Sequence, residues 1–278
     1  MSGHSVGLLL GLCSGFLTAL AHMLLKAGSD RLAVRTMIGL TCSTCALPLC
    51  MTVAPLPSIT LWPWLLCANG LHCLYQLVLV RSYDANDFST AFPVARGVAP
   101  LGAAALGVAL LGERMSPALV AGVALVSLGI FSIVAARHMA RGAVVVAVAT
   151  GLLTTAYTLI DAKAIRMAPD ALGFIAWFFA LDGLFISAMF LAVRGSAGVR
   201  PLTAELRPGA VAGLATLACF GSALWALRLA PVGAVAALRE TSILFALMFA
   251  RFGLGERIGV AGLAGGGAIA AGAVLILL

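Results

Sequence analysis

The sequence predicts an all-α integral membrane protein with ten transmembrane helices, arranged as two inverted five-helix repeats. Three observations lead to this prediction. The chain of 278 residues is 62% hydrophobic and 10% charged, whereas a soluble domain has about 25% charged residues. Apolar runs long enough to cross a bilayer recur along its whole length. Finally, landmarks of the first half return in the second half, 143 residues later.

Each predicted span approaches the roughly 20 residues that a helix needs to cross about 30 Å of hydrocarbon. Pro231 opens the ninth span, where a missing backbone amide is harmless. The first run has full length and no basic lead-in, which favours a retained span over a signal peptide. The ten predicted spans are 5–26, 36–54, 59–81, 88–111, 117–136, 142–160, 172–193, 208–228, 231–252 and 258–278.

The repeat divides the chain into residues 1–136 and 142–278, with five spans in each part. Because five is odd, the second part enters the membrane from the opposite side, and equivalent spans run antiparallel. Inverted repeats of this kind predict alternating access to a site near the bilayer midplane. The recurring landmarks are Arg96 with Arg239, LGER at 111–114 with LGER at 254–257, Gly122 with Gly265, and Gly129 with Gly272.

Glycines spaced four apart allow close helix packing, as at Gly11 and Gly15 and at Gly262 and Gly266. Packing within the bundle is favoured, and a homodimer paired through spans five and ten stays open. The LGER segments predict helix ends at the water boundary, with a gating salt bridge at each face as the sharper hypothesis.

The net charge of +7 reflects basic residues at span ends. It therefore indicates contact with anionic lipid headgroups and no nucleic-acid partner. About eleven basic residues fall on one side and about four on the other, and the positive-inside rule places the richer side in the cytoplasm. We expect a multi-pass protein of a cell inner membrane with both termini outside. The richer side holds Lys26, Arg31, Arg35, Arg81, Arg137, Arg141, Arg194, Arg200, Arg207, Arg251 and Arg257.

The connections between spans are too short for a soluble catalytic or nucleotide-binding module. There is no phosphate-binding loop, and we expect neither a cofactor nor a resident metal. All seven cysteines fall within predicted spans, where small apolar packing is the favoured interpretation. Cys42 and Cys45 share a helix face but lack two further ligands nearby.

Charged residues within spans are the main pointers to function, since each costs roughly 2.5–3.5 kcal/mol at a helix centre on insertion scales. Arg96 and Arg239 lie at equivalent depths of spans four and nine. They could recognise an anion, because a guanidinium matches a carboxylate. Equally, they could form structural salt bridges with Glu240 or Asp182. Pro93 predicts a kink or an opened turn just before Arg96.

Glu240 and Asp182 are also the best candidates for a proton-coupling group, with structural pairing as the alternative. A polar stripe on span three favours a cavity wall, since one polar residue often joins helices but several together line a cavity. His22 on span one could join that cavity or relay a proton. The stripe comprises Asn69, His72 and Gln76 on one face, with Tyr75 beside it.

Span six carries Tyr157, which could reach the cavity. Asp161, Lys163 and Arg166 follow it and are interpreted as interfacial anchors at the end of the span. Trp177 and Trp225 could stack on a ligand, although packing is the favoured role for each.

The chain contains PVARG at 93–97 with LGER at 111–114, AYTLID at 156–161, and LRET at 238–241 with LGER at 254–257. These motifs resemble the ten-helix EamA branch of the drug/metabolite transporter superfamily. The resemblance covers essentially the whole chain, and it implies a secondary carrier with a central cavity whose relatives move amino acids, metabolites or drugs. It does not select a cargo.

We therefore expect a secondary active transporter, not an enzyme, for a small polar, zwitterionic or anionic metabolite. It would be driven by the gradient of its cargo, by exchange or by protons. The alternative is an exporter of hydrophobic or cationic compounds, with Glu240 or Asp182 as the recognition group. A lipid-modifying membrane enzyme is a remote alternative, because the histidines are scattered and no loop is rich in acids.

Overall fold

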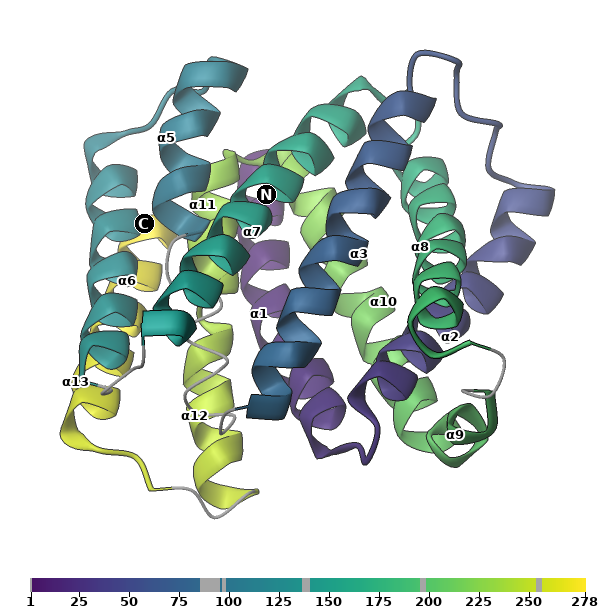
Figure 1. Ribbon diagram of the computed structural model, residues 1–278. Coiled ribbons are helices and arrows are strands. Elements are labelled where there is room, and N and C mark those ends of the chain that lie inside the picture. Colours follow the sequence, from purple (N-terminus) through teal and green to yellow (C-terminus); the bar gives the residue numbers. More distant parts are fainter. Residues whose placement is uncertain (1, 86–95, 97–98, 137–140, 196–198, 254–256) are drawn as a thin grey trace.

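The computed structural model describes residues 2–85, 96, 99–136, 141–195, 199–253 and 257–278, and within them every regular element is a helix. This confirms the predicted all-α membrane architecture. Eight helical segments of the described chain are long and apolar enough to cross a membrane. The helices (Figure 1) are α1 Gly3–Ala27, α2 Arg31–Thr52, α3 Trp62–Ala85, α5 Ala99–Leu111, α6 Pro117–Ala135, α7 Arg141–Met167, α8 Ala171–Arg194, α9 Val199–Ala204, α10 Leu206–Leu229, α11 Val232–Arg239, α12 Ser242–Phe252 and α13 Val260–Leu277.

Several helix starts follow from local sequence. The Asp30 carboxylate accepts from the Ala33 amide at the start of α2, and Asp170 accepts from two amides at the start of α8. Ser116 caps α6 in the same manner. These side chains replace backbone partners that the first turn of a helix lacks. Pro231 directly precedes α11, as the sequence predicts.

The ninth predicted span is divided in two. α11 ends at Arg239 and α12 begins at Ser242. The amides of Glu240 and Thr241 bond to carbonyls three residues back, at 3.0 and 3.1 Å. The Thr241 hydroxyl also donates to the Leu238 carbonyl at 2.7 Å. Such side-chain bonding to the backbone bends helices, which explains a break without proline or glycine.

Span six is longer than predicted. We expected it to end at residue 160 because charged residues follow, but α7 continues to Met167. Asp161, interpreted above as an interfacial anchor, is fully buried and paired with His72. A charge that has an internal partner does not mark the end of a span.

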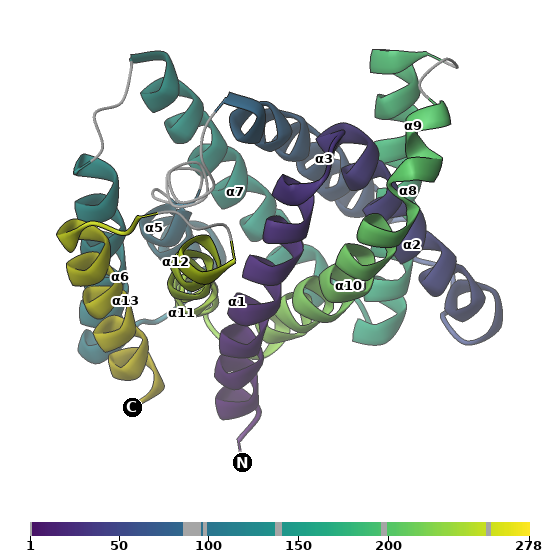
Figure 2. The same ribbon diagram turned by 90° about the horizontal axis from the view of Figure 1, so that it is seen from below.

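The most extensive helix contacts join the two halves of the chain. α1 packs on α10, α2 on α8, α6 on α13 and α3 on α7. Seen from below (Figure 2), α6 and α13 form one flank, α2 and α8 form the opposite flank, and α1, α10 and α11 lie between them. The core of the bundle is therefore shared between the halves.

Glycines form the contact between α6 and α13. A Cβ atom on Gly122 would lie 2.9 Å from the Gly272 carbonyl oxygen, and one on Gly272 would lie 2.7 Å from that of Gly122. Gly129 and Gly265 approach equally closely, at 2.6 and 2.5 Å. Two backbones can meet this closely only where side chains are absent. The landmark glycines thus pack inside the bundle.

Candidate functional site

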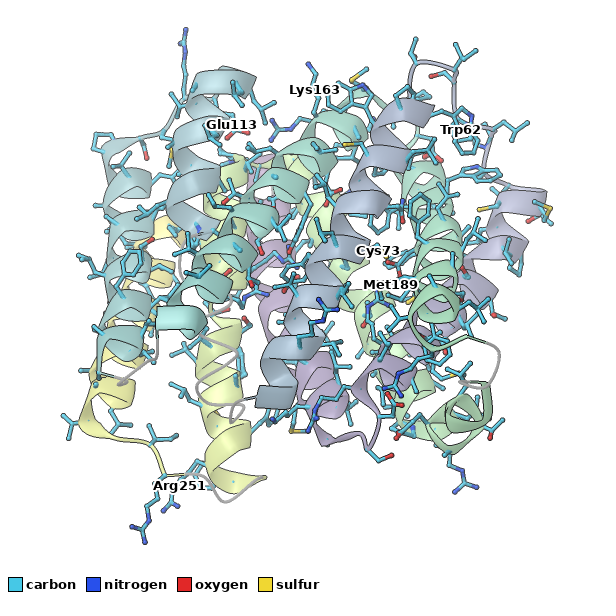
Figure 3. The ribbon with its side chains drawn as sticks, in the orientation of Figure 1. Trp62, Cys73, Glu113, Lys163, Met189 and Arg251 are labelled. Carbon is cyan, nitrogen blue, oxygen red and sulfur yellow. The ribbon has the colours of Figure 1, made fainter. Side chains whose placement is uncertain are left out.

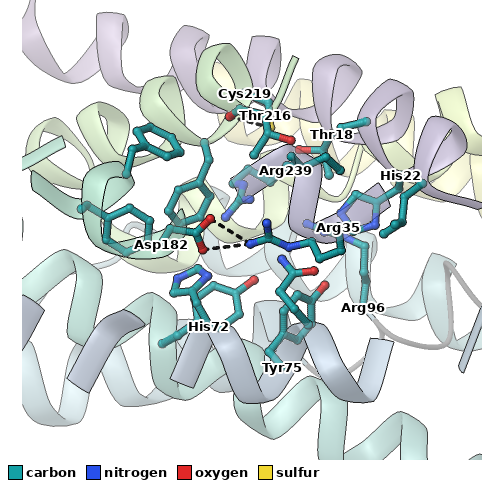
Figure 4. A pocket seen from close by; sticks show the side chains of 18 residues that line it. Thr18, His22, Arg35, His72, Tyr75, Arg96, Asp182, Thr216, Cys219 and Arg239 are labelled. Atoms are coloured by element: carbon teal, nitrogen blue, oxygen red, sulfur yellow. Dashed lines mark hydrogen bonds and ion pairs between the residues drawn. The ribbon is translucent and has the colours of Figure 1, made fainter. Parts of the chain in front are cut away.

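A central cavity lies between helices of both halves. Its volume is about 60 Å³, measured as room for the centres of water molecules, which is several times the 10–15 Å³ that about one water occupies. Polar and aromatic side chains converge on it from both halves of the chain (Figure 4). It is lined by Thr18, Ala21, His22, Leu25, Arg35, Ile38, His72, Tyr75, Gln76, Arg96, Tyr157, Phe178, Phe179, Asp182, Thr216, Cys219, Phe220 and Arg239.

Arg35 and Asp182 form one buried ion pair in the cavity wall. The Nη2 atom of Arg35 lies 2.8 and 3.0 Å from the two carboxylate oxygens of Asp182. Both side chains are less than one-tenth exposed. The pair joins α2 to α8. Asp182 therefore has the structural pairing that the sequence left open.

Arg35 is a cavity residue that the sequence does not predict. The prediction of span two at 36–54, with Arg35 among the cytoplasmic charges, is wrong for this residue, since it is 4% exposed within α2. The signal was present in Asp30, whose side chain caps the helix. Because the helix begins at Arg31, Arg35 lies one turn inside it, within the bundle.

Arg96 and Glu240 form a second buried pair, between the two halves of the chain. The Arg96 Nε atom donates to the Glu240 carboxylate over 2.6 Å, and both side chains are less than 5% exposed. Glu240 lies in the short break between α11 and α12. This pairing is the one that the sequence offered as the alternative to anion recognition. The kink expected at Pro93 lies outside the described residues.

Arg239 differs from these two arginines, because no ion pair is found for it among the described residues. Its residue exposure is 6%, and its Nε atom has no hydrogen-bond partner there. The Cζ atom of its guanidinium lies 5.3 Å from the centroid of the Phe220 ring. The cavity thus contains a buried positive charge available to a ligand, at the end of α11.

His72 and Tyr157 form an aromatic stack beside the cavity, with ring centroids 3.9 Å apart. The Nε2 atom of His72 lies 2.9 Å from a carboxylate oxygen of Asp161. The second oxygen of Asp161 is buried without a hydrogen bond among the described residues. Phe178 and Phe220 pack on the other sides of the His72 ring.

The structure brings most of the predicted site residues together. His22, Tyr75 and Gln76 line the cavity beside the residues already described. Asn69 does not line it: the side chain is fully buried and its amide donates to the Leu65 carbonyl at 2.9 Å.

The two tryptophans lie elsewhere. Trp177 donates from Nε1 to the Pro55 carbonyl at 3.0 Å and packs edge-on against Trp62. Trp225 is 39% exposed and absent from the cavity wall. Neither tryptophan is therefore among the described residues that line the cavity.

The first LGER segment ties α5 to the second half of the chain. Gly112 has a φ of +66°, which ends α5 at that point. The Glu113 carboxylate then accepts from the Val232 amide at 2.9 and 3.0 Å and pairs with Arg166 at 2.7 Å. It thereby caps α11. In the second LGER segment, residues 254–256 lie outside the described residues.

A matching tie lies at the opposite end of the bundle, where α1 meets α2. The Glu205 carboxylate accepts from the Ser29 hydroxyl and from the amides of Ser29 and Asp30, the amides at 2.9 and 3.0 Å. These donors, the hydroxyl first, hold the pKa of Glu205 below its ordinary value against the opposing effect of burial. Figure 3 shows Glu113 and Lys163 at one end of the bundle and Arg251 at the other.

Comparison with known proteins agrees with this architecture. Residues 141–278 match the EamA-like transporter family. A protein of known crystal structure has the same fold with a TM-score of 0.69, covering 98% of this chain and 96% of its own at 16% identity. No curated protein matches the chain.

The fold and the family match define a multi-pass membrane transporter. The chain is an EamA-type member of the drug/metabolite transporter superfamily, as its motifs predict. Members of this family are transporters and not enzymes.

Proposed function

We propose that this protein is a secondary active transporter that moves a small anionic or zwitterionic metabolite through its central cavity. The observation that carries the proposal is the buried guanidinium of Arg239, which has no ion pair or hydrogen bond within the described chain. An uncompensated charge within a membrane protein is costly. A bound anion would supply the missing partner through charge-assisted hydrogen bonds.

Other cavity residues are suited to complete the binding of a cargo. Arg96 would add positive potential, although its Nε atom already donates to Glu240. His22, Tyr75, Gln76 and Tyr157 would supply further polar contacts around the bound molecule. The nearby phenylalanines would contact its apolar part.

Export of cationic compounds has less support. That alternative requires Glu240 or Asp182 to recognise the cargo, but each carboxylate already accepts from an arginine at 3.0 Å or less. A cation would have to displace a guanidinium from a buried pair, and breaking such a pair is strongly unfavourable.

Reciprocal contacts support inverted repeats and hence alternating access. In a two-fold arrangement, each contact recurs between the equivalents of its two members. Gly122 contacts Gly272 and Gly129 contacts Gly265, while the sequence repeat relates Gly122 to Gly265 and Gly129 to Gly272. The contact pattern therefore has the form expected of antiparallel repeats. Rocking one half against the other would expose the cavity to each side in turn.

The distribution of basic residues supports an orientation in a cell inner membrane. Arg194 pairs with Asp30 beside the α1–α2 turn, Arg207 closely follows Glu205, which accepts from Ser29 in that turn, and Arg251 lies at the same end of the bundle. Lys163 lies at the other end together with Glu113, which pairs with Arg166. The positive-inside rule then places the end with Arg251 in the cytoplasm and both termini outside.

A counterflow assay tests the proposal whatever the driving force of transport. Proteoliposomes loaded with unlabelled small organic acids and amino acids are given traces of the same compounds in labelled form. We expect protein-dependent uptake of at least one compound, reduced roughly tenfold or more in Arg239→Gln, since a charge-assisted contact is worth about 1.5–3 kcal/mol.

The matched control is Arg251→Gln, which removes one positive charge from the exposed end of α12. This variant should transport normally. Equal uptake by Arg239→Gln and the unaltered protein, at equal amounts of incorporated protein, would remove Arg239 from the mechanism.

A further inference from the structure

We propose that the cargo is a small organic anion without an ammonium group, carried on an apolar body, and not a zwitterion such as an amino acid. This inference rests on the proposed transport function and narrows the substrate class of the same cavity. Two of the cavity arginines are paired with carboxylates, and Arg239 is not. The charge of the cargo is inferred from this difference.

Among the described residues that line the cavity, three are arginines and one, Asp182, is a carboxylate. Arg35, Arg96 and Arg239 line the cavity. Arg35 is matched by Asp182 and Arg96 by Glu240. Arg239 has no matching carboxylate within the described residues. One anionic group on a ligand would therefore balance the wall.

Among the described residues, the wall offers no comparable place for an ammonium group. Asp182 is the one carboxylate that these residues bring to the lining, and both of its oxygens accept from Arg35. Asp161 lies behind His72, to which one of its oxygens is bonded, and does not line the cavity. A zwitterion would thus bring a second positive charge to a wall that already has a surplus, and desolvation of that charge would go uncompensated.

The remaining wall is suited to an apolar body. Phe178 and Phe220 lie with ring centroids 5.2 Å apart, and Phe179 packs against both. The face of Phe220 is already occupied by the Arg239 guanidinium, so it is not open to a ligand cation. A short hydrocarbon chain attached to an anionic group would place its charge at Arg239 and its chain against these rings.

Three compounds with one carbon skeleton test the inference. They are 4-methylpentanoate, which is an anion, leucine, which adds an ammonium group to it, and 3-methylbutylamine, which lacks the carboxylate. The full-length protein in detergent is mixed with each compound at equal concentration, and its melting temperature is measured. Sodium chloride at the same concentration controls for screening of surface charge.

We expect 4-methylpentanoate to raise the melting temperature most, leucine less, and the amine no more than sodium chloride, because a ligand stabilises in proportion to its occupancy of the folded state. Arg239→Gln should abolish the shift by 4-methylpentanoate, and Arg251→Gln should leave it intact.

Two sets of outcomes overturn the inference. Stabilisation by leucine equal to or greater than that by 4-methylpentanoate would show that the cavity accepts the ammonium group. An anion-dependent shift that persists in Arg239→Gln, or no shift with any of the three compounds, would show that this arginine does not select a cargo of this class. Leucine stabilisation that is lost in Arg239→Gln would leave the proposed transport function standing, whereas unaltered counterflow in that variant would contradict the function itself.

Discussion

The Arg96 guanidinium donates to the Glu240 carboxylate over 2.6 Å, and the two residues come from different halves of the chain. Glu240 lies in the break between α11 and α12, directly after Arg239. The Arg96–Glu240 ion pair therefore joins the two halves of the chain next to Arg239, the arginine that is proposed to bind the cargo. A buried pair of this kind contributes most visibly when one member is removed, since the other charge then remains in a medium of low polarity.

Removal of one member of this pair should destabilise the protein by about 3–5 kcal/mol. Glu240→Met and Arg96→Met should each lower the melting temperature in detergent. The double variant should recover most of the loss, because neither charge is then buried without its partner. A double variant less stable than both single variants would show that the pair contributes net stability beyond mutual neutralisation.

The glycine contact between α6 and α13 predicts that alanine substitution has opposite effects on stability at two glycine positions. Gly129→Ala should lower the melting temperature, because its Cβ atom would lie 2.6 Å from the Gly265 carbonyl oxygen, and overpacking costs about 1–3 kcal/mol. Gly267→Ala on α13 meets open space. It should leave stability equal or higher, since alanine favours a helix by up to about 1 kcal/mol over glycine. Equal effects at the two positions would contradict this packing.

Glu205 lies outside the membrane spans and should make the stability of the protein depend on pH. Its pKa in the folded protein is held below 4.5 by the Ser29 hydroxyl and by two backbone amides. A lowered folded pKa means that these contacts stabilise the protein above the unfolded pKa, and that this stability is lost as the pH falls through the folded pKa. Glu205→Gln should therefore melt below the unaltered protein at neutral pH.

Melting curves measured from pH 7.5 downward check this expectation. The difference between the two proteins should shrink once the pH falls below 4.5 and continue to shrink toward the lower pKa of the folded state. A difference that stays constant over the whole range would mean that Glu205 acts through packing or through its neutral hydrogen bonds.

Cys219 offers a probe of the cavity. It lines the cavity and is 5% exposed, while the other cysteines can be replaced by alanine. Modification of Cys219 by a small, charged thiol reagent should be slow, and bound cargo should slow it further. Labelling rates in proteoliposomes, with reagent added outside or enclosed within, measure access from each face. A rate unaffected by any transported compound would place the cargo away from this wall.

The sequence predicts the helices of this protein well, because apolar runs of bilayer length have few alternatives in lipid. It also predicts Arg96, Arg239, His72 and Tyr157 at a common cavity, since polar groups within spans converge on one another or on water. Inverted repeats remain a proposal, which the reciprocal glycine contacts support.

What the sequence does not predict depends on partners distant in the chain. From the sequence alone, Asp161 indicates the end of a span. In the structure it is paired with His72, which lies 89 residues earlier in the chain. Likewise, the sequence indicates a surface charge at Arg35, whereas in the structure this residue is paired with Asp182. Local patterns reveal a charge and its depth, but its partner is determined by helix packing.

The division between α11 and α12 has a mechanical consequence. The amides on either side of Glu240 already bond to carbonyls three residues back, including Ile243 to Glu240 at 2.9 Å. A change of angle between the two half-helices would thus be absorbed by a short tight turn, and the regular bonding of both halves would persist. Arg239 is the last residue of α11, so the residue that would hold an anion lies directly beside the turn that joins the two half-helices.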